Sequence, residues 1–209
     1  MSKVVIISYT FPPQVGVGGR RWAKFCKYFV KHGAEFRVLT GPITKPGNSW
    51  IEDTTSYQSK ISSVDNPQGA ALKVIPESLS EKVKYRLALQ RAKLKTKGNY
   101  FDATVFWTDS LLPELRDCIE NGAEVIVASA GPFSYLSKLI ELKKQFPHVK
   151  LVADFRDPWT TNKTAYGYND IEPNRYQHEK TLEQDVINQF DAIVSVAQPM
   201  TDYFQSRHD

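Results

Sequence analysis

Two stretches that follow apolar runs carry charged side chains, and ligands often bind in such loops. The first, SYTFPPQVGVGGRRW at 8–22, follows VVII and leads into Arg20 and Arg21 at the start of an amphipathic segment. Free N–H groups of a helix start beside guanidinium groups suit an anion such as a phosphate. We therefore take Gly18, Gly19 and Arg20 as candidate ligand residues. The alternative is that the glycines only satisfy backbone geometry and the arginines are solvated.

The second stretch, DFRDPW at 154–159, places three charges and a tryptophan after an apolar strand. Such charges are costly to bury without partners, so we expect Asp154, Arg156 and Asp157 to face a cleft or to pair with one another. Either aspartate could hydrogen-bond a sugar hydroxyl, and Trp159 could stack on a sugar ring. The alternative is a structural Asp–Arg pair that holds the loop in place.

A third candidate is the turn from Gly131 to Ser134, which joins the predicted strand at 124–128 to a predicted helix. Its backbone N–H groups would lie at a helix start, where Gly131 and Ser134 could contact a ligand. A plain turn capped by Ser134 is the alternative.

Several chemistries lack their motifs. The glycines at 16–19 follow Pro12-Pro13 rather than a tight turn, and the second strand ends in Leu39-Thr40-Gly41 without the acid of a dinucleotide site. No cofactor is therefore expected. The four histidines are scattered, so no metal site is predicted, and no serine-nucleophile or Walker motif is present.

Strands and helices alternate along the chain, which predicts an α/β fold with a mostly parallel sheet covered on both faces. Ligands of such sheets bind beyond the carboxyl ends of the strands. The predicted strands cover 4–7, 35–40, 72–75, 124–128, 150–155 and 192–196. The predicted helices cover 19–31, a basic helix from the capping box at 78–81, 110–121 with Thr108 or Asp109 as its cap, 135–146, 172–189 and a last helix from 201. We expect a long loop at 41–69 and leave 101–107 open between strand and connector.

The charge of the chain is concentrated in one segment. Seven basic residues and no acid lie from Lys82 to Lys97, against a net charge of +4, so the rest of the chain carries −3. Val83, Leu87 and Leu94 fall near one stripe of this helix. It could lie on an anionic membrane surface, or be a solvated face. Interleaved aromatic residues are nearly absent, so nucleic acid is not the expected partner.

The motifs in this order resemble the start of family 4 glycosyltransferases. The resemblance is carried by YTFPP and GGR after the first strand, by GPFS, and by DFRDPW followed by a long helix and DAIV. It spans essentially the whole chain. The family has a GT-B architecture of two Rossmann-like domains, and residues 1–209 are similar to the N-terminal, acceptor-side domain.

The resemblance implies a retaining transfer of a sugar from a nucleotide-sugar donor to a glycan or lipid-linked acceptor. Gly18, Gly19 and Arg20 would border the donor diphosphate, and Asp154, Arg156 and Asp157 would line the floor of the cleft. Many relatives carry a histidine in the loop aligned with 131–134, but this chain has none, so no catalytic residue is assigned. The implied location is cytoplasmic, at the inner membrane face.

The family's donor-binding domain is not among these 209 residues, so we expect this chain alone to transfer no sugar. Two other hypotheses stay open. One is a non-catalytic Rossmann-like module that docks on a membrane or a protein. The other is a dehydrogenase-type nucleotide domain, which would bind NAD.

Overall fold

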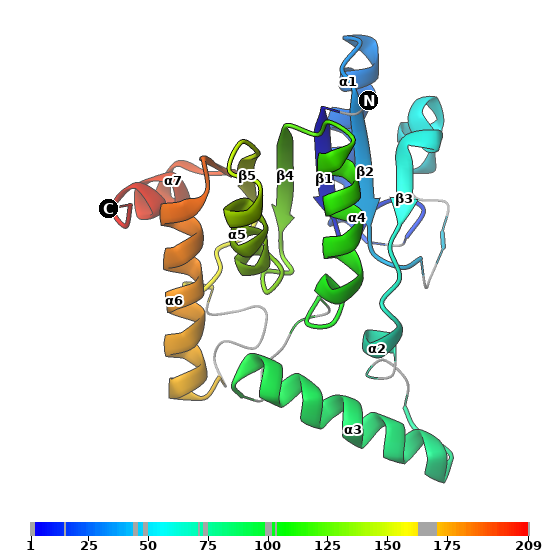
Figure 1. Ribbon diagram of the computed structural model, residues 1–209, viewed down its shortest axis with the longest axis vertical. Coiled ribbons are helices and arrows are strands. Elements are labelled where there is room, and N and C mark those ends of the chain that lie inside the picture. The colour runs from blue at the N-terminus through cyan, green and yellow to red at the C-terminus, as the bar shows by residue number, and fades with distance from the viewer. Residues whose placement is uncertain are drawn as a thin grey trace.

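The computed structural model describes residues 3–14, 16–43, 46–47, 50–70, 72, 75–98, 102, 104–162 and 171–208. Its centre is a six-stranded sheet in the order β3-β2-β1-β4-β5-β6, with every neighbouring pair parallel (Figure 1). The strands are β1 (Val4–Ser8), β2 (Phe36–Thr40), β3 (Ile61–Ser63), β4 (Val125–Ala130), β5 (Lys150–Phe155) and β6 (Ala192–Ser195). The predicted α/β, Rossmann-like fold class is confirmed.

Strand β1 shows why these apolar runs form a central sheet. Val5 and Ile7 point to one face and join one core cluster, whereas Ile6 points to the other face and joins a second cluster. All three side chains are fully buried. A continuous run of β-branched residues thus fills both faces at once, as parallel sheets require.

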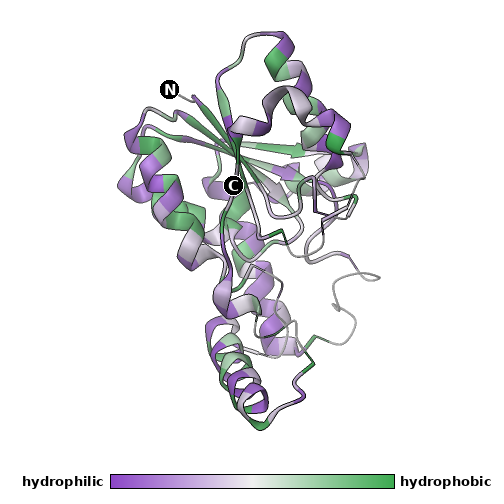
Figure 2. Cartoon of the chain, turned by 90° about the vertical axis from the view of Figure 1, so that its right-hand side faces the viewer, coloured by the Kyte–Doolittle hydropathy of each residue, from purple (hydrophilic) through white to green (hydrophobic). Residues whose placement is uncertain are grey.

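Helices cover both faces, as the edge-on view shows (Figure 2). One face carries α1 (Arg20–Lys31) and the 3₁₀ segment η2 (Thr55–Lys60), which follows η1 (Ile51–Asp53). The larger core, on the opposite face, is formed with the four helices α4 (Thr108–Glu120), α5 (Leu136–Gln145), α6 (Pro173–Gln189) and α7 (Gln198–Gln205).

Helix α3 (Leu79–Thr96) stands apart from these layers, beyond the carboxyl ends of the strands (Figure 1). Its predicted capping box is confirmed: the Ser78 side chain accepts from the Glu81 amide, and the Glu81 carboxylate accepts from the Ser78 amide. The same contacts lower the pKa of Glu81. The short α2 (Pro67–Ala70) precedes α3 in the chain.

Two expectations about the segments around α3 are wrong. The predicted loop at 41–69 contains η1, η2, β3 and most of α2, because Tyr57 is drawn into the core and its hydroxyl donates to the Ala23 carbonyl. The third strand is therefore β3 and not 72–75: Leu72 lies in a turn, and 73 and 74 lie outside the described residues. Of 101–107, residues 104–107 form a turn, and 101 and 103 are not described.

The expected caps of α4 and α5 are also wrong. Helix α4 follows Trp107 as its N-cap and has no side-chain cap, so Thr108 and Asp109 lie within its first turn. Helix α5 likewise follows Tyr135 without a side-chain cap, so Ser134 does not cap it. Within the described ranges, no helix combines the length and the apolarity needed to cross a bilayer.

Candidate functional site

Arg156 connects the three loops in which the sequence places ligand residues. Its Nη1 donates to the Gly18 carbonyl at 2.8 Å, and its Nε and Nη2 donate to the Ala130 carbonyl at 3.2 and 3.1 Å. Nη2 also donates to the Gly131 carbonyl. The loops after β1, β4 and β5 therefore meet at one corner, and it lies where the strand order reverses between β1 and β4. Such a switch point is the usual ligand crevice of an open α/β sheet.

The glycines of this corner are explained by close packing. A Cβ on Gly19 would lie 2.2 Å from the Thr10 carbonyl oxygen, and one on Gly18 would lie 3.1 Å from Arg156 Nη1. Gly131 adopts φ +79°, a conformation that favours glycine. The alternative interpretation, that these glycines satisfy backbone geometry, is therefore supported by the structure.

Asp154 is the buried anchor of the corner. It is fully buried, and Trp22 Nε1 donates to its Oδ2 at 2.7 Å. Arg21 Nη2 lies 2.9 Å from its Oδ1. Burial raises the pKa of Asp154, while the Trp22 hydrogen bond and the Arg21 and Arg156 charges act in the opposite direction. The aspartate pairs with Arg21, a residue that the sequence analysis had not matched to it.

Buried polar atoms without a hydrogen-bond partner gather around this pair. Arg21 Nη1, Ser129 Oγ and Asp154 Oδ1 form no hydrogen bond within the described part of the chain, although Oδ1 keeps the ion pair to Arg21. Ser129 stands opposite Asp154 in the register of β4 and β5, so both side chains lie on the same face. Such unsatisfied atoms are rare in native proteins and mark places where a ligand or ion is worth testing.

Arg20 is the exposed part of the corner. Its guanidinium carbon lies 3.6 Å from the ring centroid of Trp50, a cation–π contact. Trp50 has φ +67°, an uncommon conformation for a bulky residue that often marks a functional segment. No side chain caps the helix start from which Arg20 projects. Asp157 is half-buried and follows Arg156 in the loop after β5.

The turn at 131–134 is not an open anion site. One carboxylate oxygen of Asp102 accepts from the amides of Phe133 and Ser134, at 2.8 and 2.9 Å. The other accepts from the Ser134 hydroxyl at 2.6 Å. The interpretation of these amides as an anion site is wrong, because they already donate hydrogen bonds to the Asp102 carboxylate. The Ser134 hydroxyl also bonds Thr104 and lines a separate cavity between α3, α4, α5 and α6.

Trp159 does not lie in a cleft, so the expected stacking on a sugar ring is wrong. Its ring is fully buried and lies parallel to Phe133, with the centroids 5.2 Å apart. Its Nε1 donates to Glu179 Oε2 at 2.7 Å. Glu183 is equally buried and accepts from Thr160 and from the Tyr203 hydroxyl. The loop after β5 is thus fixed to α6 and α7 by buried polar contacts.

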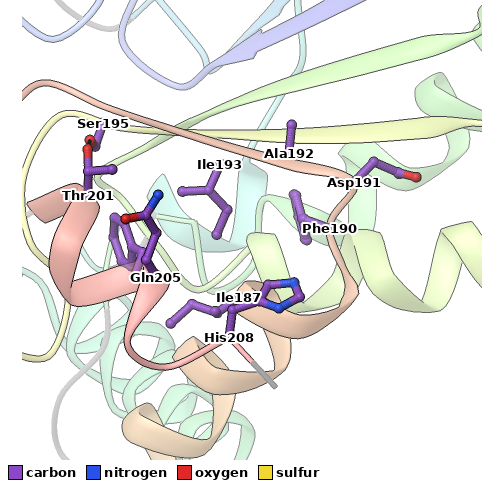
Figure 3. A pocket seen from close by; sticks show the side chains of 10 residues that line it. Ile187, Phe190, Asp191, Ala192, Ile193, Ser195, Thr201, Gln205 and His208 are labelled. Atoms are coloured by element: carbon purple, nitrogen blue, oxygen red, sulfur yellow. Dashed lines mark hydrogen bonds between the residues drawn. The ribbon is translucent and has the colours of Figure 1, made fainter.

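A separate hollow lies at the edge of the sheet, between α6, β6 and α7 (Figure 3). Its volume is about 340 Å³, with Phe190 and Ile193 among its apolar walls and Thr201, Gln205 and His208 among its polar ones. It lies beside the edge strand β6, away from the Arg156 corner.

Sequence reasoning missed Asp102 and Trp50, and it did not predict that Arg21 pairs with Asp154. Asp102 is a single acid in the stretch that the sequence left ambiguous, and nothing in its spacing pointed to a turn some 30 residues later. A buried indole N–H needs an acceptor, and the Trp22 indole finds it in Asp154. No group of three or more histidine, cysteine, aspartate or glutamate side chains suited to a metal occurs in the described ranges.

Comparison with known proteins gives no family. No family model matches the chain, and no curated protein does. Solved structures that match include a proposed 3-oxoacyl-reductase from Bacillus thuringiensis, at 11% identity over 94% of this chain and 97% of that chain, with a TM-score of 0.33. A likeness this weak carries no argument about function. The fold class rests on the sheet and its helices.

Proposed function

We propose that this chain is the acceptor-side domain of a retaining glycosyltransferase, which transfers a sugar from a nucleotide-sugar donor to a glycan or lipid-linked acceptor. The observation that carries the proposal is the Arg156 contact set, which joins the GGR, GPFS and DFRD segments at the switch point of the sheet. These are the segments on which the family resemblance rests.

The electrostatics of the corner support an anionic donor. Arg20 is exposed at a helix start that no side chain caps, and Arg21 is held by the buried Asp154 with one N–H group left over. A diphosphate placed there would receive helix amides and guanidinium groups together. In this proposal Arg20 binds the donor, and Asp154 positions Arg21.

The proposal is tested by the shift in melting temperature that nucleotide sugars produce. Because a ligand that binds only the folded chain stabilises it, uridine- and guanosine-diphosphate sugars should raise the melting temperature of the wild type. Arg20→Gln should reduce the shift, and the matched charge removal Lys24→Gln on the same helix should not. No shift with any nucleotide sugar, or a shift with NAD alone, would contradict the proposal.

A non-catalytic binding module is the second candidate, because helix α3 leaves a large apolar face exposed. The two candidates differ in what the Arg156 corner does. In the module, replacing Arg20 and Asp157 should leave function intact, whereas in the transferase it should abolish donor binding. We also expect the 209 residues alone to transfer no sugar, and measurable transfer would contradict the proposed division between two domains.

A further inference from the structure

The outer face of α3 carries four large apolar side chains, with the exposed Gln90 among them. Leu79, Val83, Leu87 and Leu94 are exposed by 83%, 57%, 55% and 79%. At about 100° per residue, these four side chains fall within about 80° of the helix circumference and so form one stripe. Figure 2 shows this helix at the lower end of the view, below the sheet, with both apolar and polar residues along it.

The fully buried side chains of α3 are small, and Tyr85 and Leu89 lie half-buried on the same inner face. Its buried residues are Ala88, Ala92 and Thr96, and Ala92 packs in a small cluster with Val105 and Phe106. A helix that simply packs on a protein core places its large apolar residues inward and its small or polar ones outward. In α3 four large apolar residues are on the outside, which is unfavourable unless something covers them.

Basic side chains border this stripe on both sides. Helical geometry places Lys82, Arg86 and Lys93 along one edge and Lys84 and Arg91 along the other. All five are exposed, and none forms an ion pair with another described residue. Lys95 differs from them, since it pairs with Asp109 at 2.7 Å. The single acid of the helix, Glu81, is held in the capping box.

We propose that the outer face of α3 docks on an anionic phospholipid bilayer. Apolar side chains between two rows of lysines and arginines match such a surface, because the leucines can enter the headgroup boundary while the cations meet lipid phosphates. A nucleic acid would use the charges but would leave the leucines exposed. This inference does not depend on sugar transfer.

The position of α3 also sets which part of the molecule faces the bilayer. The helix lies beyond the carboxyl ends of the strands (Figure 1). Its buried Ala92 packs on Val105 and Phe106. Docking through the opposite face therefore turns the carboxyl edge of the sheet toward the membrane. The Arg156 corner lies at that edge.

Vesicle co-sedimentation tests the inference. The intact chain should bind phosphatidylcholine vesicles that contain phosphatidylglycerol, and should bind pure phosphatidylcholine vesicles far less. The stripe variant Leu79→Asn, Leu87→Asn, Leu94→Asn should bind the anionic vesicles about tenfold or more weakly. The charge variant Arg86→Gln, Arg91→Gln, Lys93→Gln should lose about fivefold per charge.

A control variant separates local from general charge effects. Lys24→Gln, Lys31→Gln, Lys144→Gln removes the same charge from exposed positions on α1 and α5 and should bind as the wild type does. All substituted residues are exposed, and circular dichroism should show every variant folded. Equal binding by the stripe variant would overturn the inference, as would absence of binding to anionic vesicles. A self-association that the stripe variant abolishes, without vesicle binding, would assign the face to a second copy instead.

Discussion

Two strand-to-helix turns of this protein look alike in sequence and differ in what fills them. Both contain a glycine and a cis proline bond, and both lead from a buried strand toward a helix. In the turn before α5, Asp102 accepts from the amides of Phe133 and Ser134. In the loop before α1, no side chain caps the helix, and Arg20 and Arg21 stand in the first turn.

The two turns differ in whether the protein supplies its own carboxylate to the backbone amides. In the turn before α5, the Asp102 carboxylate accepts the hydrogen bonds of the amides. Asp154 instead pairs with Arg21 and Trp22, behind the helix start, so it organises the loop before α1 without filling its amides. The two aspartates therefore have different roles: Asp102 accepts from backbone amides, and Asp154 anchors side chains behind the helix start.

Loss of Asp154 should have the largest effect on stability. Asp154→Ala leaves the indole N–H of Trp22 and the guanidinium of Arg21 without their carboxylate, and breaking a buried pair in this way costs about 3 kcal/mol. Urea unfolding measures the change in the free energy of unfolding. Asp154→Asn keeps an acceptor for Trp22 and should lose less. Equal stability of Asp154→Ala and the wild type would show that this carboxylate does not anchor the loop.

Loss of Asp102 should cost less stability and should open the turn before α5. Asp102→Ala removes the acceptor for two amides and the Ser134 hydroxyl, an effect of about 2 kcal/mol by analogy with helix caps. Because the amides become free, inorganic phosphate should bind this turn in the variant and not in the wild type. Phosphate-induced shifts of the Phe133 and Ser134 amide signals test this. If phosphate moves them equally in both proteins, the contrast between the two turns fails.

Acidification should change the contributions of Asp154 and of a third aspartate, Asp191, to stability in opposite directions. Burial acts to raise the pKa of Asp191, but Lys143, the Leu151 amide and Lys150 together lower it to about 2. Since this folded pKa lies below the unfolded value, Asp191 stabilises the fold above about pH 4, and that stabilisation is lost as the pH falls toward about 2. Asp154, whose folded pKa is raised, has the opposite sign.

The measurement is the free energy of unfolding of the wild type and Asp191→Asn across this range. The difference between them should shrink by about 1 to 2 kcal/mol on acidification. A difference that does not change with pH would contradict the assigned role of Lys143 and Lys150.

Arg20→Gln should have the smallest effect on stability, within about 0.5 kcal/mol, because the side chain is exposed and its recorded partner is the Trp50 ring. Its effect on anion binding should be larger, about tenfold, since a charge-assisted contact is lost. Thermal melting and phosphate titration of the same samples separate the two. Marked destabilisation with unchanged anion binding would make Arg20 structural.

Much of the fold was predictable, because strands buried on both faces and helices with one apolar stripe leave clear patterns. β5 matches its predicted range of 150–155, and Gly33 and Gly122, both at positive φ, follow the ends of α1 and α4. The prediction of a loop at 41–69 was wrong because the structure of this segment depends on long-range contacts and not on a periodic apolar pattern. One such contact is the hydrogen bond from the Tyr57 hydroxyl to the Ala23 carbonyl.

The candidate site was predictable only in outline. Parallel topology brings the ends of β1, β4 and β5 to one edge, so the convergence of their loops followed from the sequence. The sequence did not predict the partner of each side chain, because Asp102 and Trp159 form hydrogen bonds with residues far away in the chain. The sequence showed chemically suitable residues, and only the contacts separated the internally satisfied ones from the exposed ones.

The central claim is that the corner between the loops after β1, β4 and β5 receives the diphosphate of a nucleotide sugar. The most direct test is an NMR titration of the isotope-labelled chain with a uridine- or guanosine-diphosphate sugar. We predict shifts of the Gly18, Gly19 and Arg20 amide signals and of the Trp22 indole signal, with no shift of the Phe133 and Ser134 amides. Shifts confined to the hollow between α6, β6 and α7, or none at all, would contradict the claim.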